Sequence, residues 1–282
     1  MKTIGFVDYY LSEWHANNYP TWMRDVADQV NTEFKVAYGW AELDVSPVDG
    51  VTSAEWCEKN GVELCSSLEE LCEKSDYIVI LAPSDPDKHL PYARVALTYG
   101  KPTYIDKTFA PNSAEAKEIF ELGKKYGAKF FSTSALRYGD ELKELGDMQT
   151  IIVTGGGSNL PEYIVHIAEI AVSVLKDASA KVMMEHKSKE RFCTVKTASG
   201  KTATLIYTSH HPYSVAGEDV NGKEYFKNIK SSFFKSLMAD ILRFFESNGE
   251  FVPFDPAETL EVMRLRDAIL AADEKPGEWI EV

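Results

Sequence analysis

Three polar residues in two separate segments are of the types that carry out acid–base chemistry. Glu162 and His166 are four residues apart, so on a helix their side chains share one face. A carboxylate at a helix start is favoured by the dipole and can hold an imidazole in one tautomer. Lys107 follows the expected strand run Pro102–Ile105 and Asp106. If that run is a parallel strand, Lys107 lies at the sheet edge where ligands of open α/β sheets bind. A helix-capping acid, a locally bonded histidine and a solvated lysine are the alternative interpretations.

The segment after the first expected strand lacks the residues that normally hold a dinucleotide. A dinucleotide-binding turn has the pattern G-x-G-x-x-G, whose backbone N–H groups contact the diphosphate at a helix N-terminus. No glycine occurs between Asp8 and His15, and Asp8 and Glu13 add negative charge. Each lost hydrogen bond to a charged group is worth roughly 1.5–3 kcal/mol. We therefore expect weak or undetectable NAD(H) binding, unless the loop folds outward and lets Ser12 and the helix N-terminus meet the phosphates.

Acidic residues after the second expected strand are candidates for contacts with a ribose. Glu42 and Asp44 follow this strand, and no Arg or Lys lies between Tyr38 and Asp49 to hold a 2′-phosphate. This arrangement favours NAD over NADP.

Strands alternate with helices through the first half of the chain, which predicts a doubly wound, Rossmann-like parallel sheet over residues 1–132. The expected strands are Lys2–Val7, Phe34–Tyr38, Tyr77–Ala82, Pro102–Ile105 and Lys129–Ser132, and the expected helices lie around Trp22–Val30 and at Ser66–Lys74, Leu90–Tyr99 and Ser113–Tyr126.

The pattern changes after Arg137. A helix at Glu162–Leu175 and terminal helices at Phe233–Asn248 and Ala257–Asp273 flank several consecutive strands: Thr150–Thr154, Lys181–Glu185, Phe192–Thr197 and Thr202–Ser209. This order predicts an α+β domain with a largely antiparallel sheet over residues 133–282.

Composition excludes several classes of partner. The formal net charge of −14 disfavours nucleic acid and anionic membranes, whose phosphates it would repel. No apolar run has the length of a membrane span or of a signal peptide.

The four cysteines lack C-x-x-C spacing, as expected for reduced thiols in a cytoplasmic protein. Adjacent histidines on a strand point to opposite faces, so His210 and His211 could not bind one metal ion without a bend. We therefore expect no metal site, and one of the two could instead line the substrate cleft.

The segment Gly100–Ala110 resembles the G-K-x-V-x-x-E-K-P motif of the Gfo/Idh/MocA family of NAD(P)-dependent oxidoreductases, with Asp106 and Thr108 in place of Glu and Pro. Further resemblances follow in the family's order: Ser75–Pro83 with His89, the pair Arg137-Tyr138, the segment from Gly155 to His166, the stretch Phe233–Gly249 with Phe254–Glu258, and Ala268–Val282.

The resemblance implies hydride transfer between a nicotinamide and a carbon of a sugar, cyclitol or related polyol. In this family, Lys107 would contact cofactor and substrate, and His166 would be the acid/base with Glu162 assisting. The cofactor would lie near Pro83, His89 and Asp106. The family also implies a homo-oligomer formed through the sheet of the second domain, and Lys107 and His166 facing one cleft. The missing glycines, Asp106 and Thr108 leave a second hypothesis open: a non-catalytic relative that serves as a small-molecule binding or regulatory module.

Overall fold

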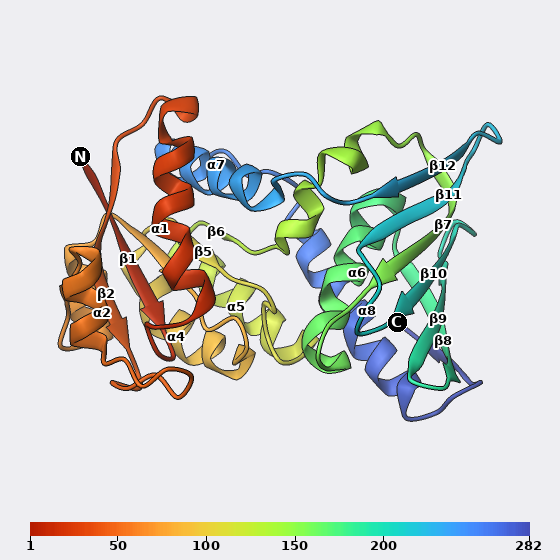
Figure 1. Cartoon of the computed structure of the whole chain (residues 1–282), viewed down its shortest axis with the longest axis horizontal. Helices are drawn as coiled ribbons and strands as arrows, with labels where there is room; N and C mark the ends of the chain where they lie inside the picture. The colour runs from red at the N-terminus through yellow and green to blue at the C-terminus, as the bar shows by residue number, and fades with distance from the viewer. The chain divides into compact units, whose positions relative to one another are not determined.

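The computed structural model describes all residues from Met1 to Val282. Its internal contacts divide the chain into two compact units (Figure 1). The first comprises Met1–Thr133 and Phe234–Pro256, and the second comprises Ser134–Phe233 and Ala257–Val282. No helix has the length and apolar composition needed to cross a membrane.

The first unit is built on six parallel strands, which confirms the predicted doubly wound sheet. Their spatial order is β3-β2-β1-β4-β5-β6. β4 is buried at all four positions, as its continuous apolar sequence predicts for a strand covered on both faces. The strands are β1 (Lys2–Asp8), β2 (Phe34–Ala41), β3 (Glu63–Leu64), β4 (Tyr77–Ile80), β5 (Thr103–Ile105) and β6 (Phe130–Phe131).

The helices of this unit begin and end at local signals. They are α1 (Trp14–Ala27), α2 (Ser53–Asn60), α3 (Leu68–Lys74), α4 (His89–Ala96) and α5 (Ser113–Tyr126). Helix α2 was not predicted, and three further details differ from expectation. The first helix starts at Trp14 rather than near Trp22, because Glu13 caps it. The N-cap of α5 is Asn112 rather than Ser113. The Glu70 side chain accepts from Ser66 instead of closing a capping box with Ser67.

One helix from late in the chain packs with the first unit. Phe234, in α7 (Phe233–Glu246), stacks on Trp22 of α1 with ring centroids 4.8 Å apart. Phe245 stacks on Tyr77 of β4 at 4.8 Å. By their contacts, residues 234–256 therefore belong to the same unit as residues 1–133. Sequence order alone would place them with the residues of the second half.

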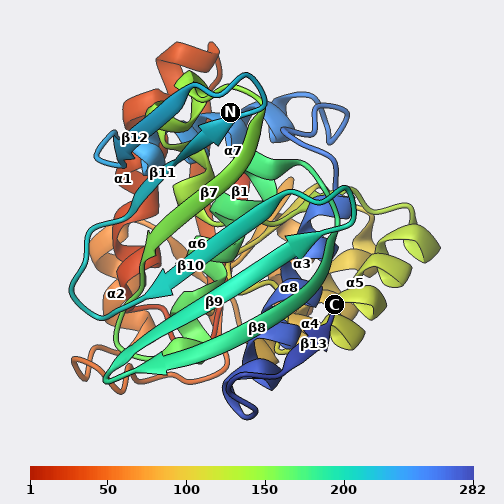
Figure 2. The same ribbon diagram turned by 90° about the vertical axis from the view of Figure 1, so that its right-hand side faces the viewer.

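The second unit contains a seven-stranded sheet in the order β12-β11-β7-β10-β9-β8-β13. Only β7 and β10 pair in parallel, so the sheet is largely antiparallel, as predicted (Figure 2). The strands are β7 (Met148–Gly155), β8 (Ser179–Lys187), β9 (Glu190–Thr197), β10 (Thr202–Tyr207), β11 (Ser214–Asp219), β12 (Glu224–Asn228) and β13 (Trp279–Glu281).

Two helices cover one face of this sheet, which lies in front of them in Figure 2. They are α6 (Leu160–Leu175) and α8 (Ala257–Asp273). Ile167 of α6 and Ile269 of α8 are fully buried in the same core as Val153 and Leu205 of the sheet. The inward-facing apolar positions of the strands are therefore covered within the chain itself.

Candidate functional site

The carboxyl ends of β1, β4 and β5 meet at one edge of the first sheet, because these strands are neighbours. Asp8 ends β1 and is almost fully buried. Its Oδ1 accepts hydrogen bonds from the backbone N–H groups of Tyr9 (2.7 Å) and Ala82 (3.0 Å), whereas its Oδ2 has no partner. Burial, with the nearby negative charge of Glu13, raises the pKa of Asp8 well above its usual range. Asp8 is therefore a carboxyl group placed where its charge is disfavoured.

Glu13 occupies the N-terminus of α1. Its carboxylate accepts hydrogen bonds from the backbone N–H groups of His15 (2.8 Å) and Ala16. These are the kind of groups that contact a diphosphate in a dinucleotide-binding fold. Burial raises the pKa of Glu13, although His15 opposes this effect. The arrangement does not fit a bound diphosphate, because a side-chain carboxylate already takes these donors and repels a second anion.

Asp106 follows β5 and is the centre of a buried polar cluster. It forms an ion pair with Nδ1 of His15 and accepts hydrogen bonds from the hydroxyls of Tyr19 (3.2 Å) and Tyr104 (3.0 Å). Burial alone would raise the pKa of Asp106, but the charge and hydrogen bond of His15, with Lys107, lower it below the usual value. Sequence reasoning named Asp106 but missed His15 and Tyr19, whose only signal was the aromatic, polar stretch after β1.

The residues expected to contact phosphate and ribose have partners within the protein. Ser12 donates its hydroxyl hydrogen to Asp49 at 2.8 Å. Glu42 forms an ion pair with Lys88 (2.6 Å) and accepts from the Tyr92 hydroxyl (2.9 Å). The bond from Lys88 lowers the pKa of Glu42.

Asp44, the other candidate for the ribose, has an exposed side chain. Its backbone carbonyl accepts from the N–H of Ser53, at 2.7 Å, and from its hydroxyl. Of the two acids after β2, Glu42 is thus engaged within the chain, while Asp44 faces solvent.

Lys107 lies at the same carboxyl edge of the sheet and is largely buried. Its Nζ donates to the backbone carbonyl of Pro83 at 3.1 Å. His89 is fully buried, and its two ring nitrogens lie 3.1 Å from the carbonyl oxygen of Phe109 and 2.5 Å from that of Leu81. Burial lowers the pKa of His89, although both carbonyls favour the protonated ring. His89 thus connects the segments after β4 and β5, while Lys107 presents an amine at their edge.

His166 belongs to the second unit, on α6. Its Nδ1 is 2.7 Å from the Ser134 hydroxyl, and its ring lies edge-on to Tyr213 at 5.9 Å. Glu162 accepts from the Asn159 side-chain amide at 3.0 Å, while its own N–H donates to Asn159 at 2.9 Å. Glu162 therefore takes part in the N-terminal cap of the helix, and Ser134 orients the histidine.

Three glycines before α6 leave room for aromatic rings around His166. The hydroxyls of Tyr213 and Tyr207 donate to the carbonyls of Gly156 (2.7 Å) and Gly157 (2.8 Å). A Cβ at Gly157 would lie 2.2 Å from the ring of Tyr163. The glycine run therefore serves packing beside the histidine.

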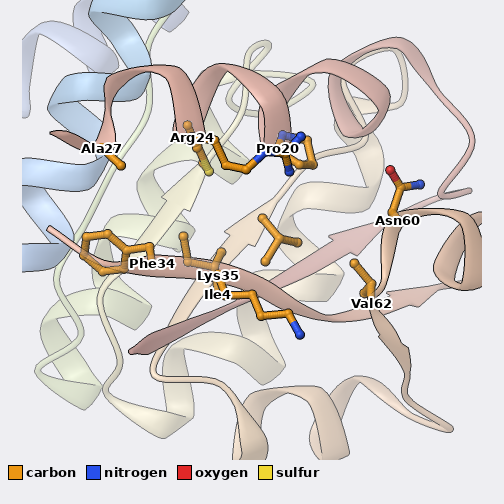
Figure 3. Close-up of a pocket in the computed structure, with 10 residues that line it drawn as sticks. Ile4, Pro20, Arg24, Ala27, Phe34, Lys35, Asn60 and Val62 are labelled. Atoms are coloured by element: carbon orange, nitrogen blue, oxygen red, sulfur yellow. The ribbon is translucent and has the colours of Figure 1, made fainter. Parts of the chain in front are cut away.

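A pocket of about 240 Å³ in the first unit lies away from these groups (Figure 3). It is lined by Pro20 and Met23 of α1, by Ile4 and Phe34 of the strands, and by Val62. Because Ile4 and Phe34 lie toward the amino ends of their strands, this pocket is not the position of the dinucleotide in such a fold.

Comparison with known proteins finds a family match that lies almost entirely within the first unit. Residues 45–134 match the model of an oxidoreductase family with an NAD-binding Rossmann fold, GFO_IDH_MocA. A segment of 66 residues is 35% identical to the uncharacterized oxidoreductase YhhX of Escherichia coli, covering 23% of this chain and 19% of that relative.

Solved structures share the fold over essentially the whole chain. A putative myo-inositol dehydrogenase from Sinorhizobium meliloti has a TM-score of 0.78 at 12% identity, with 100% of both chains covered. A scyllo-inositol dehydrogenase from Lactobacillus casei, solved with NAD(H) and scyllo-inositol, has a TM-score of 0.75 at 13% identity, covering 99% of this chain and 98% of that one.

Proposed function

Because residues 45–134 match the Gfo/Idh/MocA oxidoreductase family, we propose that the chain is an oxidoreductase of this family that acts on a carbon of a sugar, cyclitol or related polyol. The observation that carries this proposal is the position of Lys107, a buried amine at the carboxyl edge of the parallel sheet. Proteins of the same fold include inositol dehydrogenases and a UDP-N-acetylglucosamine 3-dehydrogenase, which supports the class of substrate.

The family resemblance assigns Lys107 and His166 to the same substrate, and the proposal gives each of them its own role. Lys107 would donate a hydrogen bond to the reacting oxygen, in the same way as its Nζ donates to the Pro83 carbonyl. With Nδ1 of His166 bonded to Ser134, Nε2 is the nitrogen that would exchange a proton with the substrate hydroxyl. Glu162 would act indirectly, by fixing the first turn of α6 through Asn159.

In this family a nicotinamide supplies or accepts the hydride, and the arrangement of Glu13 does not fit its diphosphate. Binding of NAD would require Glu13 to leave the N–H groups of His15 and Ala16. We propose that NAD, which the acids after β2 favour over NADP, binds weakly for this reason.

The same observation supports a second candidate function. A carboxylate that permanently takes the place of a diphosphate would suit a non-catalytic relative that binds a sugar-like molecule without turnover. The two candidates differ in whether any nucleotide enters the first unit.

Titration calorimetry with NAD and NADH, followed by assays with inositols and sugars, tests both candidates. We expect a dissociation constant for NAD near millimolar, which is about a thousandfold weaker than binding at a micromolar site. Turnover that Lys107→Ala and His166→Ala each abolish, with the fold intact by circular dichroism, supports the oxidoreductase. Binding of a polyol without nucleotide or turnover supports the second candidate. Low-micromolar NAD binding contradicts the weak-binding proposal.

We also propose that the chain forms a homo-oligomer through the open face of the second sheet. Ile152, Phe226 and Trp279 are exposed by 44%, 65% and 38%. Strand pairing places them in one row across the sheet, on the face opposite the helices: Phe226, Ala216, Ile152, Thr204, Thr194, Met183 and Trp279. An exposed apolar row of this kind is typical of an interaction surface.

A further inference from the structure

The connection between β10 and β11 brings two histidines together. The sequence predicts a strand through Ser209, and an extended backbone continuing beyond it would separate the side chains of His210 and His211. The strand instead ends at Tyr207, and the chain turns before β11 begins at Ser214. The two imidazole rings lie 4.7 Å apart between centroids, with their planes at 81°. The strand geometry that would keep both histidines from binding the same metal ion is therefore absent.

Glu190 completes a group of three potential ligands. It is the first residue of β9, whose next residue, Arg191, pairs with the last residue of β10. Coordinating atoms of Glu190, His210 and His211 all lie within 4.8 Å of one another. The Glu190 carboxylate and the His211 ring take part in no hydrogen bond or ion pair, so neither is committed to another residue.

We infer that Glu190, His210 and His211 form a binding site for a divalent transition-metal ion with the coordination chemistry of Zn²⁺. Two imidazoles and one carboxylate, with a remaining position for water, are a ligand set that zinc accepts. Magnesium and calcium prefer sets made of oxygen alone. The Thr208 hydroxyl lies 3.0 Å from Nδ1 of His210, and such a contact fixes a ring so that its Nε2 faces the metal.

Binding of an ion by these three side chains requires little movement of the backbone. Zinc binds nitrogen and oxygen at about 2.0–2.2 Å, so the three atoms must approach one another from their present separation. Both histidines are exposed and Glu190 is half-buried, so rotation of side chains can supply this movement. The ion would then connect the start of β9 to the connection after β10.

This connection also contacts residues beside His166. The N–H of Thr208 donates to the carbonyl of Gly155 at 3.0 Å, and Tyr213 packs edge-on to His166. A bound ion would therefore restrain the segment that holds Tyr213. The site uses none of the residues of the proposed oxidoreductase, and its test is independent of turnover.

The test is calorimetry of the full chain, freed of metal with a chelator, against zinc chloride. We expect one Zn²⁺ per chain and no binding of Mg²⁺. Glu190→Gln, His210→Ala and His211→Ala should each weaken the zinc affinity at least tenfold. Zinc should also raise the melting temperature of the unsubstituted chain, and this rise should be lost in the three variants, which reports on the site apart from any activity.

Two neighbouring residues on the same hairpin provide matched controls. Glu185→Gln removes an exposed carboxylate of β8, and His186→Ala removes a histidine that pairs with Asp273 at 2.8 Å. Both variants should keep the zinc affinity and the thermal shift. The inference is overturned if the chain binds no zinc, or if the three ligand variants bind it as tightly as the controls. Circular dichroism identifies any variant that fails to fold, and the other two ligand variants then decide.

Discussion

Glu13 is the residue whose replacement should most directly change nucleotide affinity. Its carboxylate takes the N–H groups of His15 and Ala16 at the start of α1. Glu13→Gly removes both the charge and the occupying side chain, so we expect NAD affinity to rise at least tenfold, or about 1.4 kcal/mol. Glu13→Gln removes only the charge and should give a smaller gain. Calorimetry with NAD measures both.

Loss of the Glu13 cap has its own cost, which a control separates from binding. Removing an N-cap side chain typically costs about 0.5–2 kcal/mol of stability, and thermal melts should show this loss. Glu33→Gln neutralises an exposed acid elsewhere in the unit and should leave NAD affinity unchanged. Equal affinities for Glu13→Gly and the unsubstituted chain would show that Glu13 does not exclude the nucleotide.

The buried carboxyl group of Asp8 should make the free energy of unfolding fall as the pH rises. Burial raises the pKa of Asp8 in the folded chain, so the folded state binds this proton more tightly than the unfolded state. Stability is then lost as the pH rises from about 3.9, the ordinary value, through the folded pKa. Asp8→Asn keeps an oxygen for the N–H groups of Tyr9 and Ala82. It should raise the melting temperature at pH 8, with a gain that vanishes near pH 4.

Asp106 should behave in the opposite way and serves as the matched comparison. Its pKa is lowered in the folded chain, with His15 as the main opposing influence to burial. Its contribution to stability is present above the ordinary pKa and is lost as the pH falls through the folded pKa. Removing one partner of a buried ion pair costs about 3–5 kcal/mol, so Asp106→Asn should destabilise at neutral pH. Thermal melts in which both variants shift the same way at pH 8 would contradict this electrostatic description.

At the scale of elements, the contact of β1 with α3 depends on the absence of a side chain. A Cβ at Gly5 would lie 2.3 Å from Oγ of Ser75 and 2.5 Å from a methyl carbon of Leu71. Because overpacking typically costs about 1–3 kcal/mol, Gly5→Ala should lower the free energy of unfolding by that amount in urea denaturation.

A double-mutant cycle shows whether the clash is the cause. Ser75→Ala removes the nearest atom, a buried hydroxyl with no hydrogen-bond partner. In this background Gly5→Ala should cost less than in the unsubstituted chain, although Leu71 still obstructs it. Strict additivity of the two substitutions would place the cost of Gly5→Ala elsewhere.

At the scale of the whole molecule, the row of exposed residues on the second sheet should determine the oligomeric state. A lysine at Phe226 or Ile152 would place a charge within a buried apolar interface. We therefore expect Phe226→Lys and Ile152→Lys to shift the species seen by light scattering toward the monomer.

Val220 provides the control for oligomerisation. It is apolar and 51% exposed but follows β11, outside the row. Val220→Lys should leave the molar mass unchanged. A monomer mass for the unsubstituted chain at micromolar concentration would contradict the proposal.

Features that depend on neighbours along the chain could be predicted from the amino-acid sequence. The apolar run at β4 identified a covered strand, and α8 has the expected bounds Ala257–Asp273. Lys107 follows β5 at the carboxyl edge, as predicted from strand order. Helix α2 was not predicted, although the sequence contains the capping box of Thr52 and Glu55 that begins it. Such signals are local because caps and periodicity involve residues within a few positions of one another.

Contacts between residues that are distant in the sequence could not be predicted from it. Asp106 and His15 are 91 positions apart, and no periodic pattern relates them. Phe245 packs on Tyr77 across a still longer interval, which places α7 with the first unit. His210 and His211 converge because β10 ends at Tyr207, two residues earlier than its sequence suggests. These arrangements arise from burial and charge pairing between segments that are remote in the sequence. Such interactions contribute free energy only once the chain has folded.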